Sequence, residues 1–146
     1  MGRKFTLQRL EWTEENFEWA CKAVQDSLHP RHLDRWQKEK FGLDLDDADP
    51  YQGHCHTASG ALYMLFGPKY LELQKGPGMR IQTRLHFWCM RKDTGEIIDL
   101  TGAEYNKINY DYSVVGTKAQ MLPYLKYYRA KDVYQNVMSQ YASRGN

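Results

Sequence analysis

Apolar residues recur at helical spacing near the start of the chain. Thr13 is followed by two glutamates, and a threonine before acidic residues is typical of a helix start. Five apolar residues then recur every three or four positions before Pro30, namely Phe17, Ala20, Cys21, Val24 and Leu28. The pattern predicts an amphipathic helix with the Cys21 thiol on its core-facing side.

A second helical pattern begins at Cys55. Residues 31–40 have the character of a short helix, and the acidic stretch 43–53 has no apolar period, which indicates a loop. After this loop, apolar residues recur at helical spacing until Gly67-Pro68, a typical stop signal. We therefore expect Cys55 to stand where the loop becomes a helix.

The pattern changes after Tyr70 to one that favours strands. Residues 70–74, 79–90 and 96–101 are predicted strands, the last two forming a hairpin, and residues 130–142 are a predicted closing helix. Helices followed by an antiparallel sheet make the expected class α+β. A length of 146 residues fits a single domain over 1–146.

The composition argues against several classes of protein but does not identify one. No apolar stretch approaches the roughly 20 residues of a membrane span, and the start lacks the apolar core of a secretion signal. Three scattered cysteines make no disulfide framework, so we expect a reducing cytoplasmic environment. The net charge of +2 is weak support for nucleic-acid binding, which we do not expect.

Three residues suited to thiol catalysis occur in the order Cys55, His86, Asp99. A helix N-terminus favours negative charge, so Cys55 is placed to react as a thiolate. The hypothesis assigns Cys55 as nucleophile, His86 as base and Asp99 as the group that orients the imidazole.

The predicted strands separate apolar from polar positions. Leu85, Phe87 and Cys89 have the pattern of core-facing residues, so His86 is expected on the other face with Trp88 and Met90. Asp99 lies between two apolar residues and is expected opposite them. An even number of residues in the connecting loop would put His86 and Asp99 on one face, whereas a three-residue loop would separate them unless a bulge intervened.

Three further residues are candidates for roles near the proposed triad, namely Gln52, Gly53 and Trp88. Gly53 would let the chain turn closely before Cys55, whose amide would then point at a developing oxyanion. Gln52 is either a further oxyanion donor or an ordinary loop residue. Trp88 either shields the polar cluster from water or simply packs.

Two stretches, QGHCHTASGAL and HFWCMRKDTGEIIDLTGAEY, together resemble the papain-like and transglutaminase-like cysteine fold, particularly small proteins of the YunG type. The resemblance covers about residues 51–105. It implies a papain-like helix and sheet, with the three catalytic roles on Cys55, His86 and Asp99. The implied function is a cysteine hydrolase or acyltransferase, such as a peptidase, amidase, deamidase or transglutaminase-like enzyme. It would act on a protein or peptide without a cofactor.

Two rival hypotheses remain. His54, Cys55, His56 and His86 are residue types that bind zinc, but adjacent positions at a helix start point in different directions, so no metal is expected. The second alternative is a noncatalytic papain-like module that binds another protein and simply buries its cysteine at a helix end.

Overall fold

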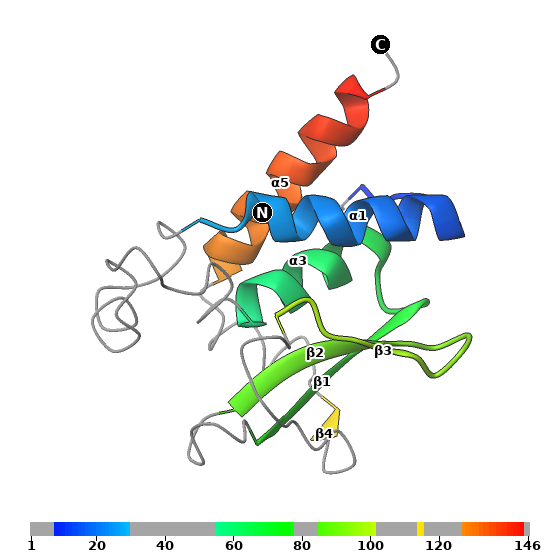
Figure 1. Cartoon of the computed structure of the whole chain (residues 1–146), viewed down its shortest axis with the longest axis vertical. Helices are drawn as coiled ribbons and strands as arrows, with labels where there is room; N and C mark the ends of the chain where they lie inside the picture. The colour runs from blue at the N-terminus through cyan, green and yellow to red at the C-terminus, as the bar shows by residue number, and fades with distance from the viewer. Residues whose placement is uncertain (1–7, 30–54, 78–84, 102–113, 116–126, 145–146) are drawn as a thin grey trace, which may run out of the picture.

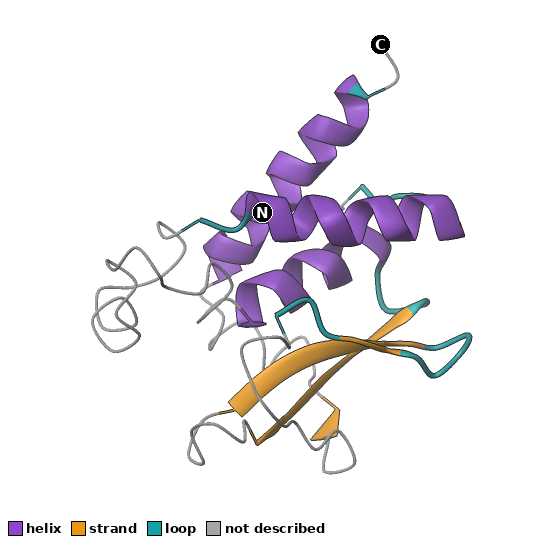
Figure 2. Cartoon of the chain, viewed as in Figure 1, coloured by secondary structure: helices purple, strands orange, loops and turns teal. Residues whose placement is uncertain are grey.

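The structure is a computed structural model that describes residues 8–29, 55–77, 85–101, 114–115 and 127–144. Three helices and four short strands lie within these ranges (Figures 1 and 2). The helices are α1 (Glu14–Ser27), α3 (Cys55–Phe66) and α5 (Tyr127–Ser143). The strands are β1 (Leu71–Pro77), β2 (Leu85–Arg91), β3 (Ile97–Ile98) and β4 (Val114–Val115).

Helix α1 begins as its sequence predicts. The Thr13 hydroxyl accepts a hydrogen bond from the backbone N–H of Asn16 at 3.0 Å, which satisfies one of the free amides of the first turn. The helix ends at Ser27, since Leu28 already has an extended backbone. Cys21 packs against the core from this helix, as expected.

Helix α3 is the central element of the described part. Every residue of α3 except His56 and Tyr63 is buried. The helix contacts α1 and α5 on one side and β1 and β2 on the other, and Figure 1 shows it between the strands and α1. Its sequence is apolar or small nearly all round, which is typical of a fully enclosed helix.

The C-terminal end of α3 is closed by Gly67 and Arg9. Gly67 has φ of +88°, in the left-handed region that glycine adopts at little cost, and its N–H donates to the Tyr63 carbonyl at 2.7 Å. The Arg9 guanidinium donates to the carbonyl of Met64. A cation at this end also suits the helix dipole.

The strands form one antiparallel sheet in the order β3-β2-β1-β4. Arg91 and Glu96 close the β2–β3 hairpin, the Arg91 N–H donating to the Glu96 carbonyl at 2.9 Å. The connection is therefore Lys92 to Gly95, and Gly95 has φ of +77°.

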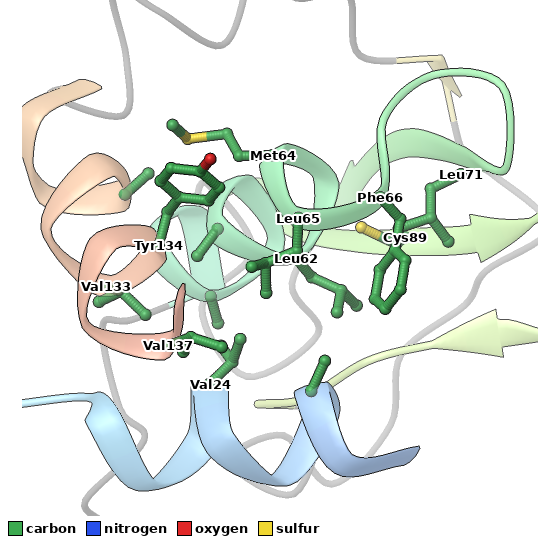
Figure 3. Close-up of a cluster of buried hydrophobic side chains, with 14 of the residues drawn as sticks. Val24, Leu62, Met64, Leu65, Phe66, Leu71, Cys89, Val133, Tyr134 and Val137 are labelled. Carbon is green, nitrogen blue, oxygen red and sulfur yellow. The ribbon is translucent and has the colours of Figure 1, made fainter. Parts of the chain in front are cut away.

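The core lies between α3 and its neighbours. Figure 3 shows Leu62 and Leu65 of α3 between Val24 of α1 and Cys89 of β2, with Val133 and Val137 of α5 also in the cluster. All six side chains are fully buried. Burial of this apolar surface is the main favourable contribution to folding.

The α+β class is confirmed, and several details differ from the expectation. The closing helix extends over Tyr127–Ser143, and β4 was not predicted. Strand β3 is limited to two residues, because the chain turns where the Thr101 N–H donates to the Asp99 side chain. The expected helix 31–40 and loop 43–53 lie outside the described residues. None of the described helices is long and apolar enough to cross a membrane.

Candidate functional site

Cys55 is the first residue of α3, as predicted. The first turn of a helix has amide groups with no partner inside the helix, and these groups and the helix dipole stabilise a nearby anion. Only 8% of the Cys55 surface is exposed. The thiol is thus buried at a helix start, where the helix dipole favours an anion and burial opposes one.

The start of α3 lies beside the start of β2. The ring centres of His56 and Phe87 are 3.6 Å apart. One turn further along, the Cys89 thiol approaches the Ser59 carbonyl at 3.5 Å. The two elements therefore run in the same direction, and Cys55 is level with the beginning of the strand that carries His86.

The register of the sheet decides a question that the sequence left open. Cys89 is paired with Ile98, so the connecting loop has an even number of residues. The pairing with β2 ends at Ile98; continued by one step, the same register would put Trp88 opposite Asp99. In a regular sheet, positions 86, 88 and 99 then belong to one face, as the hypothesis requires of His86 and Asp99. The His86 backbone is paired with Gly76, while its side chain lies outside the described part.

Trp88 belongs to the face of the sheet away from α3. Phe87 and Cys89 contact α3, so the alternation of a strand turns Trp88 to the opposite side. There its indole N–H donates to the side-chain oxygen of Gln74, its partner across the ladder, at 2.8 Å. Trp88 is fully buried. This contact fixes the orientation of the indole, and both roles that the sequence allowed for Trp88 stay open.

The described residues therefore bring part of the predicted site together. The β2–β3 register, continued past Ile98, would put positions 88 and 99 on one face. Cys55 is level with the start of β2 but belongs to the helix that covers the other face. Gln52 and Gly53, the expected oxyanion residues, lie outside the described residues, as does His54.

A hydrogen bond within its own turn fixes the side chain of Asp99. Its Oδ1 accepts from the backbone N–H of Thr101 at 3.3 Å, and its side chain is half-buried. Thr101 is buried, with 1% of its surface exposed. Thr101 is not a residue type of the proposed triad, and the signal that marks its position is Asp99, since aspartate side chains commonly bond the backbone two residues on.

The two other thiols are in surroundings that keep them protonated. Burial raises the pKa of Cys21 to about 12, despite the opposing effect of the Arg91 charge. Burial likewise raises the pKa of Cys89 well above that of an ordinary thiol. Neither is suited to act as a thiolate. Cys55 is also buried, and it differs from both in standing at the start of a helix.

In the part of the chain that the structure describes, no three His, Cys, Asp or Glu side chains are grouped to hold a metal ion. Comparison of the chain with models of known protein families, with curated proteins and with solved structures finds no match.

Proposed function

We propose that the protein is a papain-like cysteine enzyme that cleaves amides or transfers acyl groups. The observation that carries the proposal is the position of Cys55 at the start of the central helix, level with the start of β2. The even β2–β3 register, which assigns positions 86 and 99 to one face of a regular sheet, supports the pairing of His86 with Asp99.

In the proposed reaction, His86 takes the proton of the Cys55 thiol, and the thiolate attacks the carbonyl carbon of the substrate amide. His86 returns the proton to the leaving nitrogen as the carbon–nitrogen bond breaks, which leaves an acyl group on Cys55 as a thioester. Water then releases an acid, or an amine takes the acyl group. Asp99 keeps the imidazole oriented and stabilises its charged form.

The oxyanion of each tetrahedral intermediate needs hydrogen-bond donors. The backbone N–H of Cys55 belongs to the first turn of α3 and is suited to this role. Gln52 is proposed as a second donor, and Gly53 as the residue that permits the close turn of the chain. The expected substrate is a protein or peptide amide.

The proposed reaction requires the Cys55 thiol and the His86 imidazole to come into contact. In a regular strand, position 86 is on the same face of the sheet as Trp88, whereas α3 covers the opposite face, that of Phe87. The pairing of β1 with β2 is regular from Arg91 to Leu85, so Cys55 and His86 must meet around the beginning of β2, where the strand ends.

This demand also favours a second candidate function, a noncatalytic papain-like module that binds another protein. In that case Cys55 is a buried residue of the central helix, consistent with its 8% exposure, and it needs no contact with His86. The two candidates differ in whether His86 controls the reactivity of the thiol.

The test is the rate of Cys55 alkylation by iodoacetamide as a function of pH, followed by peptide mass mapping. The enzyme should react rapidly well below pH 8.5, about where an ordinary thiol titrates, and His86→Ala should abolish this reactivity at low pH. His29→Ala, at an exposed histidine beyond the end of α1, is the matched control and should change nothing. An ordinary thiol profile, or one that His86→Ala leaves unchanged, would overturn the enzyme proposal and leave the binding module as the remaining candidate.

Intact-mass analysis after incubation with amide-directed electrophiles would then identify the substrate class. A stable adduct on the wild-type protein that is lost in Cys55→Ala would show which carbonyl group the site accepts. Addition of an amine would separate hydrolysis from acyl transfer.

A further inference from the structure

Thr101 combines two features that a turn residue does not need. Its backbone N–H donates to Oδ1 of Asp99 at 3.3 Å, and its side-chain hydroxyl is buried with no hydrogen-bond partner among the described residues. A buried hydroxyl with no partner costs folding free energy, because it has given up its bonds to water. Such a group in a native structure calls for an explanation.

Hydrogen bonds fix the turn that contains Thr101. The carbonyl of the preceding residue, Leu100, accepts from the side-chain amide of Gln25 on α1 at 3.0 Å. The turn is thus tied to α1 through Leu100 and to Asp99 through the Thr101 N–H. The hydroxyl therefore occupies a defined buried position.

Valine has nearly the same shape as Thr101 and would bury no polar atom. A threonine in this place is disadvantageous for folding alone unless its hydroxyl is bonded in another state of the protein. The nearest functional group that the structure joins to Thr101 is the Asp99 carboxylate.

We infer that Thr101 is a positioning residue for Asp99, an inference that rests on the proposed cysteine chemistry. The backbone N–H holds one carboxylate oxygen, and the hydroxyl donates a second hydrogen bond to the carboxylate when His86 takes up the thiol proton. Two donors fix the carboxylate in one orientation beside the imidazolium. Thr101 does not touch the substrate.

The experiment compares Thr101→Val and Thr101→Ser with the wild type. Thr101→Val should melt at the same or a higher temperature and should slow Cys55 alkylation below pH 7 by about tenfold, as loss of a supporting hydrogen bond commonly does. Thr101→Ser, which keeps the hydroxyl, should restore most of the rate. In an Asp99→Asn background, Thr101→Val should have less than about a twofold further effect, because the two residues act as one unit.

The outcomes separate this inference from the proposed function. If the wild-type thiol has an ordinary pH profile, the proposed function fails, and the inference falls with it. If the wild-type thiol is activated but Thr101→Val leaves its rate unchanged, only the inference is overturned. A clear fall in the melting temperature of Thr101→Val would also overturn it, since the hydroxyl would then be serving stability.

Discussion

Arg91 on β2 and Glu14 at the start of α1 are joined across 77 positions of the chain, with the arginine Nη1 donating to both carboxylate oxygens at 3.1 and 3.0 Å. The same guanidinium donates twice to Asp93 in the hairpin turn, and it lies 5.0 Å from the ring centre of Trp12 and 4.9 Å from that of Phe17. The arginine thus fastens the start of α1 to the β2–β3 hairpin.

The first prediction concerns the stability that this arginine provides. Arg91→Met should lower the free energy of unfolding by about 1–3 kcal/mol, since the side chain is only 9% exposed and makes charge-assisted hydrogen bonds. The control is Lys22→Met, which breaks an ion pair to Asp26 whose partners are 75% and 56% exposed. That change should cost less than about 0.5 kcal/mol. Urea unfolding of both variants provides the comparison, and equal losses would contradict the prediction.

The second prediction is a pH dependence that arises from Asp93. Hydrogen bonds from Arg91, and secondarily from the Trp12 indole, hold the pKa of Asp93 below its usual 3.8. A carboxyl with a lowered folded-state pKa adds stability above its unfolded pKa and loses it as the pH falls through the folded value. Asp93→Asn should therefore be less stable than the wild type at pH 7.

Below the folded-state pKa of Asp93, the stabilities of wild type and Asp93→Asn should converge. Urea unfolding between pH 7 and pH 2 measures both curves. Asp26→Asn, at the exposed pair with Lys22, is the control and should run close to the wild type at every pH. A constant difference between the Asp93 variant and the wild type would show that the charge of Asp93 has no part in it.

The third prediction compares the two glycines with positive φ. Gly67→Ala and Gly95→Ala should each cost about 1 kcal/mol for the left-handed backbone. An added Cβ at Gly67 would lie 3.1 Å from Nε of Arg9, whereas one at Gly95 would meet nothing within 4 Å. Gly67→Ala should therefore be the more destabilising in thermal melts.

If displacement of Arg9 is the cause of that difference, it should disappear in an Arg9→Ala background. Gly67→Ala in that background should then cost the same as Gly95→Ala. A difference that persists would indicate that the backbone at Gly67, and not its contact with Arg9, determines the cost.

The fourth prediction is the order in which the three thiols react in the folded protein. If exposure alone decided, the half-buried Cys21 would be labelled before Cys55, which is 8% exposed. We expect the reverse at pH 8, because burial raises the pKa of Cys21 to about 12 while Cys55 begins a helix. Peptide mapping after brief alkylation measures the order, and labelling in denaturant, where all three should react alike, is the control.

The local parts of the fold were predictable and the long-range pairings were not. The start of α1 depends on Thr13 and the residues just after it, and the span of α3 depends on its own apolar spacing and on Gly67. Strand β4 contains two valines that pair with Gln74 and Lys75, some 40 residues away in sequence, and no local signal marks such a pairing.

The candidate site was predictable to a similar degree. The place of Cys55 follows from the change between loop and helix patterns. To predict which residues of β2 and β3 share a face, one must know the length of the hairpin loop. That length depends on whether Lys92 belongs to the strand or to the turn. Asp99 was expected inside a strand, but its own side chain ends β3 by accepting from the Thr101 N–H. Side-chain bonds of this kind compete with the ladder, and apolar alternation does not reveal them.

The enclosure of α3 has a consequence for synthesis of the protein on the ribosome. The helix is covered by α1, which precedes it, and by the sheet and α5, which follow it. Of the elements in the described ranges, α1 alone has been made when α3 leaves the exit tunnel, and the sides of α3 that face the sheet and α5 become covered only as translation proceeds. Chaperones that bind nascent chains should therefore recognise this helix in particular, and a pause in translation before α5 should increase aggregation.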